Sequence, residues 1–466
     1  MGNLILITAD SLRADHMPLY GYDRNITPNL DSLAELVFKQ SYSNGPVTPI
    51  SIPSLLTSKY PLEDGHITVD TKPTFIDDLH SSSYTTGLVT SNIQFERFEY
   101  TDRFDYVANG TKAKQNTDGK NETDPLIRLA KWGLHQGGVI GKAAAVAKET
   151  FHRFRGPIVS RQPDSDLFMK SEEWISTVEE PYLLWLHGMD THTPFVFSPE
   201  HFEQVSEFEY DPNRFARILE RAMTHMRKGD FVWSLDTDQR QYLVDAYDAS
   251  ILNFDQQLGE FINRLDLEET TVIVSSDHGE EFWERGHFSH PGRDTIPRPM
   301  TLYEEIVKIP LVMFGKDVPN RKIKTPVSLI DVFPTILDLA DVETDTKPRG
   351  ESLLRIAEAN EDLSRPVITQ TTSPGDPNHY AQSEGAYRMG SIRRGDLKYI
   401  YNEKHDHELY DLSTDPEEQN NIIAARAHEA DQLRGELLRY FGEVTDSELE
   451  TSSSVEDRLK ELGYLG

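Results

Sequence analysis

Four segments of the chain place acidic, hydroxyl or imidazole side chains directly after an apolar run or at the predicted start of a helix. In open α/β sheets, ligands bind beyond the carboxyl ends of the strands, so polar residues at these ends are the first candidates for a site. The segments are Thr8 to Ser11, Thr48 to Thr57, Leu183 to Pro194 and Val272 to Gly279.

Asp10, Asp277 and His278 predict a site for one divalent cation, because carboxylates and imidazoles are common metal ligands. The alternative is that the acids cap separate turns and the imidazole is solvated. Repetition at successive strand ends favours the metal site. We expect all three side chains to lie ~2.0–2.6 Å from the cation. The ligand types suit Mn²⁺, Zn²⁺, Mg²⁺ or Ca²⁺, and the imidazole favours Mn²⁺ or Zn²⁺.

The second segment predicts a helix start, with Thr48 as the N-cap and Pro49 at the first helical position. The free N–H groups and positive dipole end of a helix start suit an oxyanion. The alternative is a capped helix without chemistry. Pro53 limits how regular its first turn is.

The remaining candidates are imidazoles and an acid in two loops. His187, Asp190 and His192 follow a strongly apolar run, and His287 and His290 follow shortly after the fourth segment. Three such groups in one loop are less easily explained as turn caps than one would be.

The elements that must position these residues follow from the apolar pattern. Short β-rich runs alternate with helical patterns to about residue 340, which predicts βαβ units and a mostly parallel sheet buried on both faces. Apolar residues at helical spacing predict a helix over Gln241–Leu265. The clearest strands are Leu4–Thr8, Thr86–Val89, Tyr182–His187, Thr271–Ser275 and Ile309–Phe314.

The pattern changes after about residue 345 to shorter, alternating strands around Arg393 to Asp396 and a helix near Ala427–Phe441. We therefore expect a catalytic domain at 1–345 and a smaller C-terminal α+β subdomain at 346–466. Residues 110–165 are rich in Lys, Asn, Gly and Asp, which predicts an insertion away from the sheet.

Composition excludes several classes of function. The 466 residues include 78 acidic and 47 basic side chains, a net charge of −31, which argues against nucleic-acid or anionic-membrane binding. The absence of cysteine excludes disulfides, thiolate nucleophiles and thiolate-bound metals. The charge excess predicts a halophilic surface. With no signal peptide and no membrane-spanning run visible, we expect a cytoplasmic protein.

Together these motifs resemble the sulfatase branch of the alkaline phosphatase superfamily, nearly end to end. The resemblance implies an α/β sandwich with a large, mostly parallel central sheet flanked by helices, plus a smaller C-terminal α+β lobe. The matching pieces are Asp10 to Tyr22, Thr27 to Asp31, Ser54 to Thr57 with Tyr60-Pro61, the His192 loop, Ser276 to Glu280, Leu302 to Glu305, Asp331 to Thr335, Glu408 to Leu412 with Asp415-Pro416, and Leu459 to Leu465.

The resemblance also implies roles for individual residues. Thr48 would be the nucleophile and a metal ligand, with Asp10, Asp277 and His278 as the other ligands. The substrate's non-bridging oxygens or leaving group would meet His192 and His287. Weaker candidates for substrate binding are His187, Asp190, His290 and Ser11.

Several positions depart from the sulfatase pattern. Sulfatases convert a Cys or Ser nucleophile to formylglycine and carry an Arg shortly after it, whereas this chain has Thr48 and Ile52, so no formylglycine is expected. Ser11 stands where sulfatases have a second metal-binding Asp, and their Lys/His pair is not evident near Ser91-Asn92. With Ser51 and Pro53, the Thr48 segment is similar to that of phosphoethanolamine transferases, and its metal set to that of phosphonate monoester hydrolases.

These features predict a metal-dependent hydrolase, with transferase activity as an option, that cleaves phosphate or phosphonate esters through a phospho-Thr48 intermediate. A hydroxyl beside a cation and a helix N-terminus can attack phosphorus. The substrate would be a small molecule, glycan or lipid-head-group ester. One alternative is a sulfatase acting on sulfated carbohydrate without formylglycine, and another is a non-catalytic binding protein on the same fold.

Overall fold

The computed structural model of this chain describes residues 2–63, 73–97, 99–109, 163–228, 235–290, 300–359, 365–373 and 387–442. The predicted insertion at 110–165 lies almost wholly outside these residues, and so does the matching terminal segment 459–465. Within the described residues, no helix has the length and apolar character that crossing a bilayer requires.

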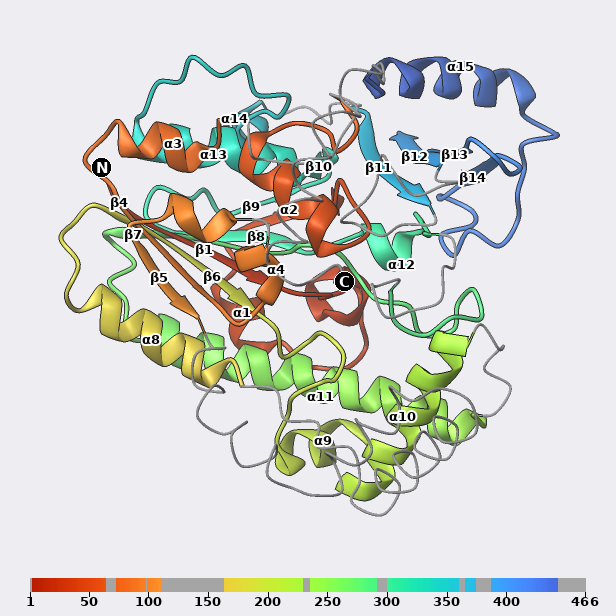
Figure 1. Ribbon diagram of the computed structural model, residues 1–466, viewed down its shortest axis with the longest axis horizontal. Coiled ribbons are helices and arrows are strands. Elements are labelled where there is room, and N and C mark those ends of the chain that lie inside the picture. Colours follow the sequence, from red (N-terminus) through yellow and green to blue (C-terminus); the bar gives the residue numbers. More distant parts are fainter. Residues whose placement is uncertain are drawn as a thin grey trace, which may run out of the picture.

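A central sheet of eight strands in the order β5-β4-β6-β1-β7-β8-β2-β9 organises the molecule (Figure 1). Neighbouring strands from β5 to β7 are parallel, whereas β8 is antiparallel to β7 and β2. The predicted mostly parallel sheet is confirmed. Its strands are β1 (Asn3–Ala9), β2 (Leu36–Phe38), β4 (Thr85–Thr90), β5 (Tyr106–Asn109), β6 (Tyr182–Gly188), β7 (Thr270–Ser276), β8 (Leu311–Gly315) and β9 (Arg321–Ile323).

The sheet is buried on both faces, as the near-continuous apolar strands require. Leu4 and Leu6 of β1 join one core cluster, whereas Ile5 and Ile7 join the other. This alternation is the two-residue period of a strand. In Figure 1, α2 (Thr48–Thr57), α3 (Phe75–His80), α13 (Val332–Ala340) and α14 (Leu353–Glu358) lie on one side, and α8 (Ser165–Ile175) and α11 (Thr237–Ile262) on the other.

Two predicted boundaries were displaced for identifiable reasons. Helix α11 begins at Thr237 instead of Gln241, because Asp236 and Gln239 form a reciprocal capping box that apolar periodicity does not reveal. Strand β8 begins at Leu311 instead of Ile309, directly after Pro310, which has no N–H to donate to a sheet. The other helices and short strands are α1 (Pro28–Leu33), α4 (Ile93–Arg97), α9 (Pro199–Val205), α10 (Pro212–Lys228), α12 (Glu304–Val307), β3 (Ser41–Tyr42) and β10 (Val327–Ser328).

A smaller antiparallel sheet follows in the C-terminal part of the chain, in the order β11-β12-β13-β14. Gly395 adopts a left-handed φ of 59° in the tight turn between β12 and β13, a conformation that favours glycine. Leu433 and Leu437 of α15 join the core beneath this sheet. The elements are β11 (Val367–Ser373), β12 (Tyr387–Arg394), β13 (Leu397–Asn402), β14 (Glu408–Asp411) and α15 (Ala427–Leu437). The division at residue 345 stays a prediction.

Candidate active site

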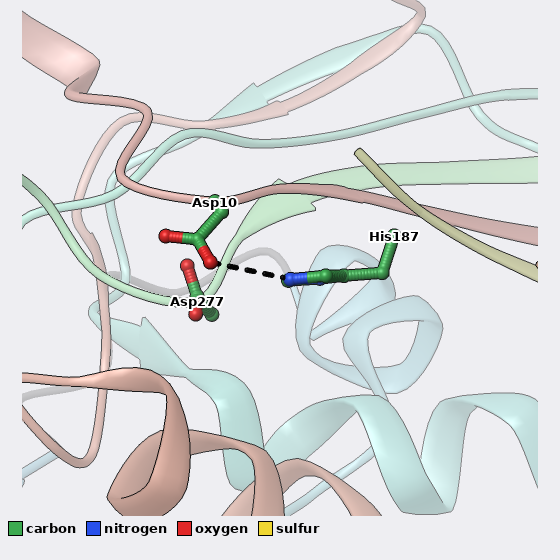
Figure 2. Close-up of side chains that lie close together, drawn as sticks. All are labelled: Asp10, His187 and Asp277. Carbon is green, nitrogen blue, oxygen red and sulfur yellow. Dashed lines mark ion pairs between the residues drawn. The ribbon is translucent and has the colours of Figure 1, made fainter. Parts of the chain in front are cut away.

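The carboxyl ends of three adjacent parallel strands deliver the centre of the site. Strands β6, β1 and β7 are neighbours, with Thr8 paired to His187 and Ala9 paired to Ser276. The next residues of β1 and β7 are therefore Asp10 and Asp277, which emerge side by side and are completely buried (Figure 2). Strand order thus brings together two acids that are 267 residues apart.

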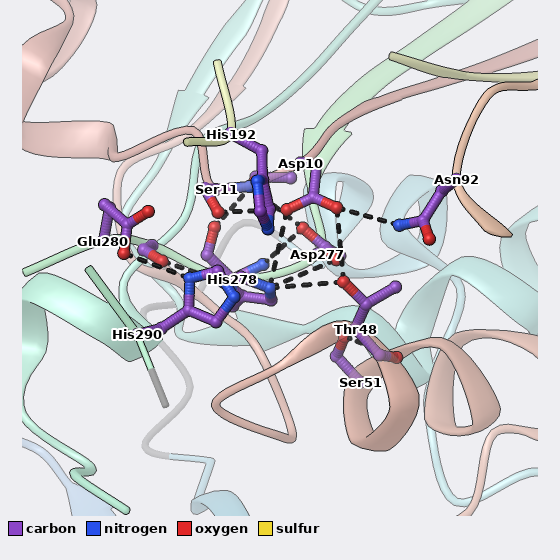
Figure 3. Close-up of polar contacts among 12 residues, drawn as sticks. Asp10, Ser11, Thr48, Ser51, Asn92, His192, Asp277, His278, Glu280 and His290 are labelled. Atoms are coloured by element: carbon purple, nitrogen blue, oxygen red, sulfur yellow. Dashed lines mark hydrogen bonds and ion pairs between the residues drawn. The ribbon is translucent and has the colours of Figure 1, made fainter. Parts of the chain in front are cut away.

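Helix α2 points its first residue at these acids. The Thr48 hydroxyl oxygen lies 3.3 Å from Asp10 Oδ2 and 3.4 Å from His278 Nε2 (Figure 3). The predicted N-cap role of Thr48 is wrong: the helix begins at Thr48 itself, Val47 is the N-cap, and no side chain caps it. The hydroxyl is thereby left facing the acids instead of the helix N–H groups.

The spacing of His278 from Asp10 and from Asp277 is that of ligands around one cation. His278 Nε2 lies 3.6 Å from Asp10 Oδ1 and 3.5 Å from Asp277 Oδ2. Two ligands placed tetrahedrally at ~2.0–2.2 Å from one cation are separated by ~3.3–3.6 Å. Buried Asp277 Oδ2 also receives no hydrogen bond from the described residues. A bound cation would satisfy this oxygen.

The two acids differ in their electrostatic environment. Burial raises the pKa of Asp10, but the charges of His192, His187 and His278 outweigh burial and hold it well below the usual range. The pKa of Asp277 is raised by burial and by the charge of Asp10. Two buried carboxylates that repel each other form an environment that a divalent cation would relieve.

Ser11 lies between the two acids, at the position where the sulfatase pattern has a second metal-binding Asp. Its backbone N–H donates to Asp277 Oδ1 at 3.2 Å, and its hydroxyl donates to Asp10 Oδ1 at 3.0 Å. Its φ of 64° turns the chain sharply after β1, which permits both bonds. In this position Ser11 orients the carboxylates.

Imidazoles border the acids on the side away from Asn92 (Figure 3). The ring of His290 lies 4.5 Å from that of His278 and 5.0 Å from that of His192, measured between centroids. His290 Nδ1 is 3.0 Å from a carboxylate oxygen of Glu280. Although burial raises the pKa of Glu280, the charge of His290 outweighs it and the pKa is lowered. The paired ring of His290 can bind an anion or supply a proton.

The other predicted site residues have different surroundings. Half-buried His287 offers its carbonyl to the Trp283 N–H, and the ring contacts of its loop with His192 and His278 come from His290. Both carboxylate oxygens of Asp190 accept hydrogen bonds within the scaffold, Oδ1 from the Asp164 N–H and Oδ2 from Asn253 and Gln257. Asp190 therefore holds the loop that carries His192.

Two residues at the centre were absent from the predicted set. Asn92 donates to Asp10 Oδ2 at 3.0 Å, and its Oδ1 accepts from the Gln94 N–H. It follows β4 by two residues, so the strand-end rule could have found it. Glu280 follows Gly279 in the same motif as Asp277, but only the fold reveals its pairing with His290.

Comparison with known proteins identifies the family. The sulfatase profile matches residues 2–342 of this chain. The chain belongs to the sulfatase family. A second profile, that of the N-sulphoglucosamine sulphohydrolase C-terminal region, matches residues 298–443 of this sulfatase family member.

Relatives of this sulfatase family member align along most of its length. The uncharacterized sulfatase YidJ of Escherichia coli is 25% identical over 474 residues, covering 95% of this chain and 88% of YidJ. The choline-sulfatase of Rhizobium meliloti is 24% identical over 452 residues, covering 90% and 82%. The crystal structure of phosphonate monoester hydrolase from Agrobacterium radiobacter superposes with a TM-score of 0.67 at 18% identity, covering 94% and 95%. The chain therefore has the fold of the family and is an ester hydrolase.

Ile52 stands where sulfatases carry an Arg shortly after their nucleophile, and in this chain its side chain packs in the core. Ile52 is completely buried and belongs to the core cluster beneath the central sheet. A guanidinium there would have to enter an apolar core, which is costly without a partner. The packing of α2 therefore favours an apolar side chain at position 52 and disfavours the Arg of the sulfatase pattern.

Proposed function

We propose that this sulfatase family member hydrolyses phosphate or phosphonate esters through a covalent phospho-Thr48 intermediate. The observation that carries the proposal is the Thr48 hydroxyl, which stands 3.3 Å from Asp10 Oδ2 and 3.4 Å from His278 Nε2 where the family nucleophile is expected. A threonine cannot become formylglycine, and its alcohol forms a stable phosphoester.

Asp10, Asp277, His278 and Thr48 would hold one divalent cation. When bound, it supplies positive charge that favours the alkoxide and offsets the charge of the substrate oxyanion. Its identity stays a prediction, with Mn²⁺ or Zn²⁺ favoured.

The residues of the chain account for the proton and bond changes. The Thr48 hydroxyl passes its proton to Asp10 Oδ2, to which it donates at 3.3 Å, its oxygen attacks phosphorus, and the bond from phosphorus to the leaving alcohol breaks. His192 or His290 protonates the departing alkoxide, since the charge of each ring acts on Asp10. A water then attacks phosphorus and gives a proton to the imidazole, which is now neutral; the bond to Thr48 breaks, and Asp10 returns its proton to the Thr48 oxygen as phosphate or phosphonate leaves. His287 stays a predicted contributor, as does transfer to an alcohol instead of water.

Sulfate ester hydrolysis is the second candidate, because the chain aligns with the choline-sulfatase over 90% of its length. Sulfate monoesters could be cleaved by the same attack. We nevertheless favour phosphorus, since Thr48 lacks the easy exit for sulfate that a formylglycine hydrate provides.

Phosphorus ester hydrolysis and sulfate ester hydrolysis can be distinguished with substrates that share one leaving group. Protein loaded with Mn²⁺ or Zn²⁺ should turn over an aryl phosphate, phosphodiester or phosphonate faster than the aryl sulfate with the same leaving group. Acid-quenched turnover of the phosphate should show, by mass spectrometry, a phosphoryl group on the Thr48 peptide. Faster sulfate cleavage would support the sulfatase alternative. Metal binding without turnover of any ester would support a binding protein.

A further inference from the structure

His187 lies against the proposed cation site, and the proposed mechanism gives it no role. Its side chain is completely buried, and its Nε2 is 3.5 Å from Asp10 Oδ2. One ligand atom from each of Asp10, His187 and Asp277 lies within 4.8 Å of the other two (Figure 2). We propose, on the basis of the metal-dependent function above, that His187 Nε2 is an additional ligand of the cation.

The distance between His187 and Asp10 suits a shared cation better than a hydrogen bond. A nitrogen–oxygen hydrogen bond is typically ~2.7–3.2 Å long, so 3.5 Å is long for one. The same separation, 3.5–3.6 Å, relates His278 Nε2 to Asp277 and Asp10. His187 of β6 and His278, which follows β7 by two residues, thus stand at nearly the same distance from a carboxylate oxygen, His187 from Asp10 Oδ2 and His278 from Asp10 Oδ1 and Asp277 Oδ2.

The hydrogen bonds around His187 place the proton of its ring on Nδ1 and the lone pair on Nε2. Asn92 Oδ1 accepts from the Gln94 N–H, so its Nδ2 must be the donor that faces His187 Nε2 at 3.4 Å. A donor facing Nε2 places the ring proton on Nδ1, which lies 2.8 Å from the Thr8 hydroxyl. A histidine ligand commonly donates from one nitrogen to a protein oxygen while the other binds metal.

The Thr8 partner is itself fixed in place. Its hydroxyl oxygen accepts from Trp185 Nε1 at 2.9 Å, and all three residues lie within the paired strands β1 and β6. The imidazole is therefore held rigidly before any ligand arrives. Position 11 carries Ser11 instead of the metal-binding Asp of the sulfatase pattern. In the proposed site, the imidazole nitrogen of His187 is a metal ligand in addition to the two carboxylates and His278. Two imidazoles with two carboxylates favour Zn²⁺ over Ca²⁺.

His187→Asn separates a ligand role from a packing role. Its side-chain amide occupies the Nδ1 position and can still donate to Thr8, whereas nothing replaces Nε2. Isothermal titration of metal-free protein should show Zn²⁺ affinity lowered at least about tenfold and Ca²⁺ affinity changed much less. X-ray absorption at the zinc edge should count two imidazoles in the wild-type protein and one in the variant.

His16→Asn is the matched control, because His16 is a buried imidazole bonded through Nδ1 to Asp248, which belongs to another cluster. It should leave Zn²⁺ affinity unchanged. One imidazole at the wild-type zinc edge would overturn the proposal even if His187→Asn failed to fold. Weaker binding with both imidazoles retained would also overturn it. A wild-type protein that binds no divalent cation would contradict the proposed function itself, whereas a single imidazole leaves that function standing.

Discussion

Two clusters of buried charge in this protein are built in opposite ways. In the C-terminal cluster, Lys398 Nζ lies 3.0 Å from Glu304 and 2.9 Å from Glu418, and each of these side chains is largely or fully buried. At the site, no lysine or arginine in the described part of the chain pairs with Asp10 or Asp277.

The two clusters differ in the source of the positive charge that accompanies their buried carboxylates. Burial lowers the pKa of Lys398, but the charges of Glu304 and Glu418 outweigh burial and raise it, so the ammonium stays charged. Burying an ion is tolerated only when opposite charge accompanies it. The chain provides that charge in the C-terminal cluster, whereas the acids of the site have imidazoles as their only ionisable partners in the described residues, and we propose that a cation from solution completes them.

The largest effect should come from removing the nucleophile while the acids stay in place. Thr48→Ala should lower phosphate ester turnover by about 10³-fold or more, because the covalent step is lost. Thermal unfolding should change little and most of the metal affinity should be kept, since Asp10, Asp277 and His278 remain. Thr48→Ser is the control and should keep partial activity, measured in the same assay. Near wild-type rates for Thr48→Ala would show that Thr48 has no nucleophilic role.

In the C-terminal cluster, a substitution should lower stability, whereas Thr48→Ala at the site should lower activity. Lys398→Met removes the cation that Glu304 and Glu418 share, leaving Arg393 at 3.4 Å from Glu304 and Arg285 at 3.9 Å from Glu418, and should lower the free energy of unfolding by about 3 kcal/mol. Urea titration of metal-free protein measures this. The double variant with Glu418→Gln should recover part of the loss. A loss below about 1 kcal/mol would mean that the pair is as weak as a surface ion pair.

Glu305, beside Arg285 at the edge of the same cluster, predicts a pH dependence. Burial raises its pKa from the usual 4.5 to about 7, although Arg285 opposes this. The folded protein therefore binds this proton more tightly than the unfolded chain. Its contribution to stability should be complete below about pH 4.5 and lost as pH rises through about 7, by up to about 3 kcal/mol. Urea unfolding across this range should be flatter for Glu305→Gln. Equal slopes would contradict the assignment.

At the site, neutralising one acid should stabilise the metal-free protein. Asp277→Asn keeps the oxygen that accepts from the Ser11 N–H and removes the repulsion with Asp10. We expect a gain of about 1–2 kcal/mol, typical of relieving a destabilised active site. A chelator should lower the thermal midpoint of metal-loaded wild type but not that of Asp277→Asn. Destabilisation of the metal-free variant would remove the contrast between the clusters.

The smallest effect concerns surface charge, outside both clusters. The net charge of −31 should make unfolding salt-dependent, because screening lengths fall from ~10 Å at 0.1 M to ~3 Å at 1 M. We expect the thermal midpoint to rise by about 2 °C or more in molar potassium chloride. A flat or falling midpoint would count against a halophilic surface.

The sequence by itself determined the kinds of groups available and where along the chain they occur. Apolar strand-length runs required a sheet covered on both faces, and Asp10 and Asp277 directly after two of them had to leave the sheet at strand ends. The lack of cysteine excluded a thiolate nucleophile, and the resemblance to the family pointed to Thr48 as the proposed one. These inferences depend on local periodicity and residue chemistry, which a single sequence contains.

Only the tertiary structure decided which groups meet. Strand order placed β1 between β6 and β7, which brought His187 to the acids and gave its ring a partner in Thr8. It likewise set Asn92 against Asp10 and Glu280 against His290. The physical reason is that strand order, helix packing and loop direction minimise the free energy of the whole core. A contact between distant residues is a result of that packing and leaves no periodic signal in the chain.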